Sequence, residues 1–249
     1  MNMIHTTKPT KEQKKDMESL VASCREKEPM SLTAPLEEDL EYDIFLLYEK
    51  DHLSAMAFLF FPDDTRCECC AFVEPAERRK GYFAKLLGKV LDLVEAYEKK
   101  LGQSVDFCFL ADERTPSAQA VLKAMEAEYW YSEHTMARSL TPKDQAYVMD
   151  SLTIEPEGDH LYSACFKGSV IGTCAVIPSE RQFYLYSFQI HEDYQGQGFG
   201  TQFLLGMLSL LSRTGHRVTL QVSGQNYIAR NLYKKTGFQT TESLSYYLY

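Results

Sequence analysis

The chain has 249 residues, of which 45% are hydrophobic and 24% charged, and its formal net charge is −9 at pH 7. This length exceeds the usual size of one domain and suits two domains of roughly 100–150 residues each. The negative charge argues against a nucleic-acid-binding protein that relies on a basic surface. A negative surface can attract a cationic or amine substrate, although many soluble proteins are acidic for solubility alone.

Targeting segments and disulfides are not indicated by the sequence. The N-terminal segment is polar and lysine-rich, and no apolar run approaches the ~20 residues of a membrane span. The seven cysteines lack a framework of even spacings, so reduced thiols and a cytoplasmic location are expected. In the cluster Cys67-Glu68-Cys69-Cys70, Cys67 and Cys69 share one face of a strand and Cys70 lies on the other. This pattern favours buried small hydrophobes over a metal site, and we expect no metal.

The first half of the chain is predicted to begin with a helix over about residues 9–26, followed by an acidic loop at residues 37–39. Two strands at 42–48 and 53–61 form a hairpin by their pattern, and a third strand covers 66–73. The basic turn Arg78-Arg79-Lys80-Gly81 precedes an amphipathic helix that ends at Gly102. The remaining elements of this half are a strand at 105–110, a short helix at about 117–126 and a strand at about 134–140.

The same order of elements then appears again, without the opening helix. Strands are expected at 147–154, 160–166, 170–177 and 182–190, followed by a glycine-rich turn and a helix that ends at Thr214-Gly215. A strand around 218–222, a helix at about 226–235 and a strand at 244–249 complete the second half. An internal duplication is the economical explanation. We expect an N-terminal domain at residues 1–141 and a C-terminal domain at residues 142–249, joined near Pro142.

The glycine-rich turn Gln195-Gly196-Gln197-Gly198-Phe199-Gly200 joins a strand to a helix, an arrangement that suits phosphate. The first amides of a helix lack intrahelical partners, the helix dipole adds partial positive charge, and glycine allows close approach. The dinucleotide motif G-x-G-x-x-G fails because Thr201 stands three residues after Gly198, and the phosphate-loop motif lacks its lysine. A tight turn that needs glycine for its backbone angles is the alternative interpretation.

Two motifs carry a resemblance to a known family. Residues 188–200, which contain Gln-x-x-Gly-x-Gly, resemble the pyrophosphate loop of the GNAT superfamily of N-acetyltransferases. Residues 226–238 are similar to that family's later signature, Asn-x-x-Ala-x-x-Leu-Tyr-x-x-x-Gly-Phe. The resemblance covers nearly all of residues 147–249. It implies an α+β (mixed α/β) fold of two tandem GNAT-like domains, each with a mostly antiparallel central sheet flanked by helices.

The resemblance also implies a role for each matching residue. The backbone amides of Phe188 and Ile190 would hold the pantetheine arm and the acetyl carbonyl of acetyl-CoA, and an amide there could stabilise an oxyanion. Asn226 would contact the cofactor or simply cap its helix. Tyr233 would protonate the departing thiolate, the alternative being a packed ring with a solvated hydroxyl. The pyrophosphate would be held by the amides of Gln195, Gly196, Gln197, Gly198, Phe199, Gly200 and Thr201.

The implied reaction is direct transfer of an acetyl group from acetyl-CoA, the acyl donor, to a primary amine of a small molecule. Protein N-termini or lysines are alternative acceptors, and a non-catalytic CoA-binding or regulatory module is an alternative of another class. No nucleic-acid or membrane partner is expected. The amine must lose a proton, which requires a base or a water relay. Where some relatives carry a glutamate on the cofactor strand, this chain has Tyr184, and spacing does not choose among Glu180, Tyr186, His191 and Glu192.

The first half carries a weaker copy of the same motifs. In the turn from Glu77 to Phe83, Arg78 and Gly81 are in register with the family's loop, but Phe83 stands at the small-residue position. By the same spacing, Ser117 replaces the asparagine and Ala124 the tyrosine. The N-terminal domain is therefore expected to be degenerate and to shape the substrate cleft, as in tandem members such as mycothiol synthase, where one domain retains the chemistry.

Overall fold

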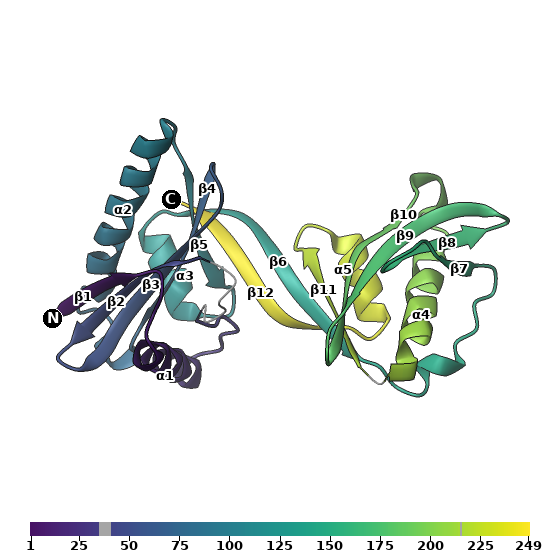
Figure 1. The fold of residues 1–249 in the computed structure, drawn as a ribbon, viewed down its shortest axis with the longest axis horizontal. Coiled ribbons are helices and arrows are strands. Elements are labelled where there is room, and N and C mark those ends of the chain that lie inside the picture. The colour runs from purple at the N-terminus through teal and green to yellow at the C-terminus, as the bar shows by residue number, and fades with distance from the viewer. Residues whose placement is uncertain (35–40, 215) are drawn as a thin grey trace. The chain divides into compact units, whose positions relative to one another are not determined.

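The computed structural model describes residues 1–34, 41–214 and 216–249. The predicted acidic loop at 37–39 and Gly215 lie outside these residues. The chain forms two compact units (Figure 1). The first unit consists of Met1–Ser132 together with Ser243–Tyr249, and the second unit consists of Glu133–Glu242.

The first unit is a six-stranded sheet with helices on both faces. Its strand order is β1-β2-β3-β4-β5-β12, in which β4 and β5 are parallel and every other neighbouring pair is antiparallel. Its elements are β1 (Asn2–Thr6), α1 (Lys11–Lys27), β2 (Asp43–Glu49), β3 (His52–Asp63), β4 (Arg66–Val73), a short 3-10 turn (Pro75–Glu77), α2 (Tyr82–Leu101), β5 (Asp106–Asp112), α3 (Pro116–Ala124) and β12 (Gln239–Leu248).

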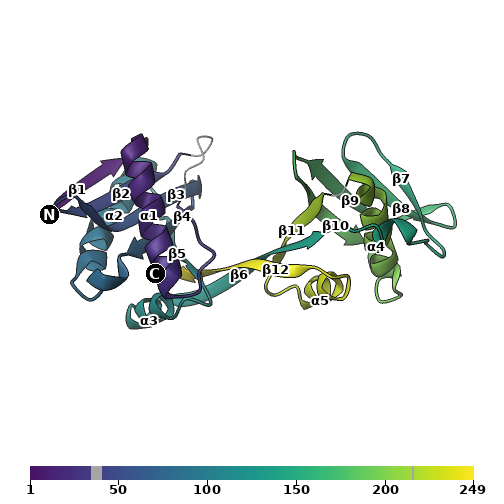
Figure 2. The same ribbon diagram turned by 90° about the horizontal axis from the view of Figure 1, so that it is seen from below.

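The helices of the first unit cover opposite faces because each has one apolar stripe. A capping box between Thr10 and Gln13 starts α1, whose buried residues include Met17 and Leu20 and pack on β2, β3 and β4. Figure 2 shows α1 in front of these strands. The helices α2 and α3 pack into a separate core on the other face. As predicted, Cys67 and Cys69 lie in one core and Cys70 in the other.

The second unit repeats this sheet but keeps helices in a single core. Its strand order is β6-β11-β10-β9-β8-β7, in which β10 and β11 are parallel and every other neighbouring pair is antiparallel. Both of its α-helices pack into one core cluster with Phe203, Met207 and Tyr233. Its elements are β6 (Glu128–Ser139), a 3-10 turn (Asp144–Ala146), β7 (Thr153–Pro156), β8 (Leu161–Phe166), β9 (Ser169–Pro178), β10 (Gln182–Ile190), a 3-10 turn (Glu192–Tyr194), α4 (Phe199–Leu211), a 3-10 turn (Ser212–Thr214), β11 (Arg217–Ser223) and α5 (Tyr227–Lys235).

Two strands are exchanged between the halves of the sequence. After α3, β6 pairs with β11 over Glu133–Ser139, and after α5, Leu244–Leu248 of β12 pair with β5. The strands β6 and β12 can be followed in teal and yellow in Figure 1. The compact units therefore divide the chain differently from the boundary predicted after residue 141. The reason is that each sheet takes its last strand from the other half of the sequence.

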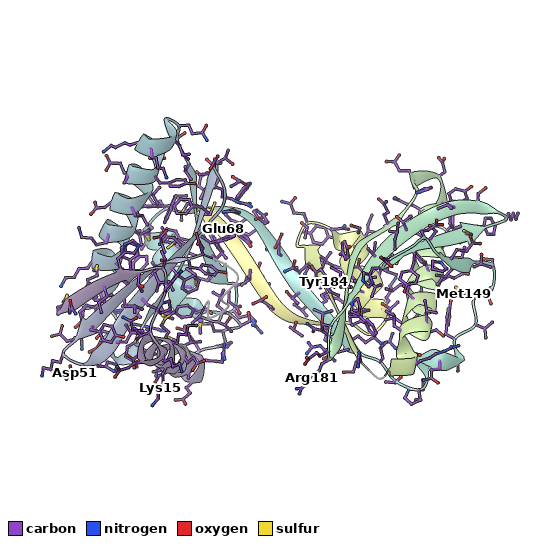
Figure 3. The ribbon with its side chains drawn as sticks, in the orientation of Figure 1. Lys15, Asp51, Glu68, Met149, Arg181 and Tyr184 are labelled. Atoms are coloured by element: carbon purple, nitrogen blue, oxygen red, sulfur yellow. The ribbon has the colours of Figure 1, made fainter. Side chains whose placement is uncertain are left out.

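Two details of the strands differ from the sequence analysis. Residues 147–154 were expected to be a strand, but regular β-structure begins only at Thr153. Apolar side chains before Thr153 pack against α4 instead. The Sδ of Met149, for example, lies 2.5 Å from the position that a Cβ on Gly206 would occupy. Met149 is labelled beside α4 in Figure 3. The strand β1 was not predicted at all. None of the helices in the described part of the chain is both long and apolar enough to cross a membrane.

Candidate functional site

The site in the second unit is built where two parallel strands diverge. The ladder between β10 and β11 covers Gln182–Tyr184 and Arg217–Thr219 and ends there. Beyond this point β10 continues to Ile190 and β11 to Ser223. The backbone of β10 is therefore open toward β11 over its last residues.

A bulge in β10 creates this divergence. The register against β9 shifts between Tyr186 and Gln189, and Ser187 takes a positive φ of 50°. Gly172 of β9 makes the bulge possible, because a Cβ there would lie 2.5 Å from the backbone oxygen of Gln189. A backbone atom cannot yield as a flexible side chain can, so this position requires glycine.

The backbone amides of Phe188 and Ile190 point toward the opening. The Gln189 carbonyl faces Gly172 of β9, and the His191 amide donates to the Ile171 oxygen at 2.8 Å. Since backbone groups alternate along a strand, the amides of residues 188 and 190 face the opposite side, toward β11. This is the orientation that the sequence resemblance implies for a strand edge that binds a ligand.

The glycine-rich turn leads from β10 into α4. Gly196 and Gly198 take φ values of 73° and 86°, which non-glycine residues seldom adopt. The side chain of Gln195 closes the turn by donating to the Ile190 oxygen at 2.8 Å, and Gln197 donates to the Asp193 oxygen at 2.9 Å. A Cβ on Gly198 would meet nothing within 4 Å, so the turn is open on that side.

The first turn of α4 presents backbone to solvent. The Phe199 side chain points inward instead, and its ring is buried against Phe166 and Tyr194. Gly200 faces the side chains of Leu232 and Ile190, and Thr201 is exposed in the first turn. The amides of residues 198–200 belong to the N-terminus of α4, where backbone donors lack intrahelical acceptors and the dipole favours an anion; the Thr201 amide donates to the Gly198 oxygen at 3.1 Å.

The later motif places one capping residue and one buried tyrosine. The Asn226 side chain accepts from the Ala229 amide at 3.0 Å, so Asn226 is the N-cap of α5, which is the simpler of its two predicted roles. Tyr233 is 5% exposed and packs edge-on against Phe188 with 6.4 Å between ring centroids. Its hydroxyl has no hydrogen-bond partner among the described residues, and burial raises its pKa to about 12. Tyr233 thus stays protonated beside the open edge of β10.

Next to the opening between β10 and β11, the face of the sheet that points away from α4 and α5 carries polar side chains. The Tyr184 hydroxyl donates to the Gln221 side chain at 3.0 Å, and its ring stacks on Tyr186 with 6.1 Å between centroids. Burial, with a smaller effect of the nearby Glu133 carboxylate, raises the pKa of Tyr184. Tyr184 is labelled on β10 in Figure 3. The Glu133 carboxylate is thus close enough to Tyr184 to affect its pKa.

Glu133 is a candidate residue that the sequence did not indicate. It comes from β6, where it pairs with Ser223 at the end of β11. Of the residues considered from the sequence as a base, Tyr186 is on this face with 39% exposure. Glu180, His191 and Glu192 are exposed in the turns that flank β10. No sequence spacing links residue 133 to residues 182–190, because only the strand exchange brings β6 next to β11.

The first unit repeats the divergence and the turn. Its parallel ladder ends at Cys69 and Phe109, while β4 runs on to Val73. Arg79 and Gly81 take φ values of 65° and 83°, matching Gly196 and Gly198. The Arg78 Nε donates to the Val73 oxygen at 3.3 Å, as Gln195 does to Ile190. The predicted register of Arg78 and Gly81 is thus supported by backbone geometry.

The predicted register of the later motif is wrong by two residues. The Ala127 amide bonds to the Leu122 oxygen as the Phe238 amide bonds to Tyr233, and Glu126 has the positive φ of Gly237. The helix N-caps are Thr115 and Asn226. Thr115, not Ser117, therefore corresponds to Asn226, and Leu122, not Ala124, corresponds to Tyr233. The segment between the basic turn and α3 is two residues shorter than the predicted alignment of the motifs requires. The first unit still lacks the tyrosine hydroxyl, because Leu122 stands in its place.

All seven cysteines are buried thiols, and burial raises the pKa of Cys174, behind Tyr233, to about 12. In the described part of the chain, no group of three or more histidine, cysteine, aspartate or glutamate side chains could hold a metal ion.

Comparisons with known proteins agree with this geometry. Residues 120–238 match the sequence profile of the acetyltransferase (GNAT) family. Over 64 residues the chain is 34% identical to the uncharacterized N-acetyltransferase YycN of Bacillus subtilis (strain 168), which covers 25% of this chain. The chain thus spans only 41% of the length of that curated relative.

Two solved structures resemble the whole chain. One is a GCN5-related N-acetyltransferase from Sphaerobacter thermophilus, with a TM-score of 0.77 and 14% identity over 99% of this chain and 95% of that chain. Another is a tandem GNAT protein from the clavulanic acid biosynthesis pathway, with a TM-score of 0.66 and 14% identity over 100% of this chain and 98% of that chain. These likenesses confirm the predicted α+β fold with two tandem units of mostly antiparallel sheet.

Proposed function

Because residues 120–238 match the acetyltransferase (GNAT) family, we propose that the second unit transfers an acetyl group from acetyl-CoA to a primary amine of a small molecule. The observation that carries the proposal is the buried Tyr233, which packs on Phe188 at the edge where β10 leaves β11. The same unit contains the glycine turn at the entrance of α4. A binding turn, an open strand edge and a buried hydroxyl donor thus occur together.

The second unit fits acetyl-CoA on structural grounds. Space beside Gly198 and the helix N-terminus of α4 suit a diphosphate, which needs backbone donors and no intruding Cβ. The amides of Phe188 and Ile190 bind the pantetheine arm and the acetyl carbonyl in this proposal. Bound acetyl-CoA supplies an activated thioester. The bulge at Ser187 keeps the strand edge in the conformation that binds it.

Different residues around the opening assist the attack of the amine, the departure of the thiolate and the removal of the amine proton. The amide at the end of β10 stabilises negative charge on the acetyl oxygen as the amine attacks. Tyr233 donates a hydrogen bond to the departing thiolate from the α5 side. Glu133, near Tyr184 on the opposite face, attracts the substrate ammonium and accepts its proton directly or through water. No covalent intermediate with the chain is needed.

Two alternatives make different predictions. A non-catalytic CoA-binding or regulatory module binds acetyl-CoA without turnover on any amine; the buried, protonated Tyr233 favours an enzyme instead. A protein acceptor requires turnover on peptides with free N-termini or lysines. The carboxylate near the stacked tyrosines favours a compact cationic amine.

The test begins with calorimetric titration of acetyl-CoA into the whole chain. We expect one site per chain, strongly weakened by Gly198→Val because the new side chain fills the space left for phosphate. Gly158→Val is the matched control: Gly158 also has a positive φ, 115°, and open surroundings, but lies in the turn between β7 and β8. Equal weakening by both variants would mean that backbone strain alone is responsible.

An acceptor screen then separates enzyme from binding module. Free thiol released from acetyl-CoA is measured with small primary amines and with peptides. Release that depends on a small amine supports the proposal. Failure of acetyl-CoA to bind would refute it, and binding without release on any acceptor would favour the regulatory module.

A further inference from the structure

The first unit contains a cavity that the proposed reaction does not use. Its volume is about 550 Å³, within the range of small-molecule sites. It lies where β4 and β5 diverge, between the first turns of α2 and α3. Most of its wall is apolar, with contributions from Phe72, Phe83, Phe109, Val121 and Leu122.

A strap, residues 28–32, contributes a wall of this cavity and is held by hydrogen bonds. The amide and hydroxyl of Ser31 donate to the Asp112 carboxylate at 2.7 and 2.6 Å. The Thr115 hydroxyl donates to the Pro29 oxygen at 2.8 Å. Met30 and Leu32 line the cavity from the strap. The strap follows α1, which has no counterpart among the described residues of the second unit, so only the first cavity is walled in this way.

The carboxylates around the cavity are already neutralised. Glu28 pairs with Arg78 and accepts from the Ser117 hydroxyl at 2.5 Å. Asp112, fully buried, pairs with Arg114 at 2.7 Å. Arg78 is therefore not available to a second anion, although it stands in the place of Gln195 in the loop.

One cation at the cavity has no such partner. Arg79 is exposed, lines the cavity and makes neither a hydrogen bond nor an ion pair with the described residues. It precedes the N-terminus of α2, whose dipole also favours an anion. The site thus offers an apolar interior and one free positive side chain.

The cavity lacks the chemistry of the second unit. Leu122 occupies the position of Tyr233, so the cavity lacks the hydroxyl that would donate a hydrogen bond to a leaving thiolate. Phe83 replaces Gly200 beside the helix N-terminus. With Arg78 held by Glu28, the loop is also less suited to a diphosphate than its three basic residues indicate.

We propose that this cavity binds, without converting it, an amphiphile with one carboxylate and an unbranched apolar chain, a medium-chain fatty acid. The chain fills the space between α2, α3 and the strap, and the carboxylate meets Arg79. The inference concerns the first unit alone and does not depend on the proposed acetyl transfer in the second.

The probe is octanoate, titrated by calorimetry into the whole chain with saturating acetyl-CoA present. One site per chain is expected. Hexanoate, which is shorter by two methylenes, should bind about 15-fold more weakly, since each buried methylene contributes about 0.8 kcal/mol. Val121→Trp should weaken octanoate at least tenfold by filling the cavity; Val121 is 37% exposed, so a larger side chain can be accommodated.

Arg79→Asn should also weaken octanoate about tenfold, because asparagine tolerates the positive φ but carries no charge. Lys100→Asn is the matched control: it removes an exposed cation at the far end of α2 and should leave octanoate binding unchanged. A thermal unfolding profile like that of the wild type shows that each variant is folded, whether or not acetyl-CoA binds.

Three results would overturn the proposal. The first is the absence of octanoate binding, and the second is octanoate binding that Val121→Trp does not affect. The third is competition by desulfo-CoA for the octanoate site, with both ligands weakened by Arg79→Asn, which would make the cavity a second CoA site. Loss of affinity in both first-unit variants, with hexanoate weaker than octanoate, supports it.

Discussion

Replacement of Tyr233 by phenylalanine removes one hydroxyl and little else. The Tyr233 side chain is 5% exposed, and its ring contacts the rings of Phe188 and Phe238. A phenylalanine ring preserves both contacts. Since the hydroxyl has no partner among the described residues, the variant should unfold at nearly the wild-type temperature. Acetyl-CoA affinity should also change by less than about twofold, because loop and strand amides carry that binding.

The expected loss of turnover follows from the pKa of Tyr233, which burial raises to about 12. A thiol has an ordinary pKa near 8.5, well below that of Tyr233, so complete proton transfer from Tyr233 to the thiolate is unfavourable. The hydroxyl therefore acts chiefly as a hydrogen-bond donor to the thiolate. Such a bond to a charged group is worth about 1.5–3 kcal/mol, or about 10- to 150-fold in kcat.

The assay is single-turnover thiol release with the best amine from the acceptor screen, which isolates the chemical step. Because Tyr233 remains protonated well above neutrality, the wild-type to Tyr233→Phe ratio should be constant from pH 6 to pH 10. Tyr162→Phe, a change in β8 on the same core, should not alter the rate. Equal rates for wild type and Tyr233→Phe, or a ratio that collapses near pH 8, would refute this account.

Other variants test the strand edge, the base and the strap. Gly172→Ala should lower both thermal stability and acetyl-CoA affinity, because its Cβ would collide with the Gln189 oxygen; wild-type behaviour in calorimetry would contradict the proposed role of the bulge. Glu133→Gln should lower kcat/KM about 10²-fold or more at pH 7 and leave acetyl-CoA affinity unchanged, as expected for loss of a general base; an unchanged pH–rate profile would exclude it. Burial raises the pKa of Asp112, but hydrogen bonds from Arg114 and Ser31 outweigh it and hold the pKa at about 2. Since this lies below the unfolded value of about 4, the stabilisation is full above pH 4 and is lost as pH falls through 2. Asp112→Asn should thus cost about 2 kcal/mol in urea unfolding at pH 7 and clearly less at pH 3.

Local signals predicted the elements that position the site. The strand at 182–190 alternates in pattern and is bounded by turns, and its limits agree with β10. The apolar residues after Gly81 recur at three- and four-residue spacing, which predicts an amphipathic helix, and α2 is observed there. The glycine turn was recognisable because Gly196 and Gly198 need positive φ, a requirement written into the residue type.

Elements whose structure depends on distant contacts were missed. The strand β1 is short and half exposed, and pairing with β2 gives it its structure. The apolar residues before Thr153 have a strand-like composition, but Met149 packs against α4 at Gly206, where no side chain is in the way. The position of Glu133 likewise depends on a pairing between residues far apart in sequence, which composition and periodicity do not report.

The same reasoning explains why the division of the chain could not be read from its repeats. The two halves repeat in sequence near residue 141, where Pro142 and polar residues separate apolar runs. In the structure, however, β6 crosses into the second unit and Ser243–Tyr249 return to the first. A cut at residue 141 would remove the partner of β5 and leave its backbone donors and acceptors unpaired, while β11 would lose the ladder that holds Glu133. The sequence repeat therefore marks the duplication, whereas the folding units are defined by the exchanged strands, and the proposed base belongs to the second unit although it lies in the first repeat.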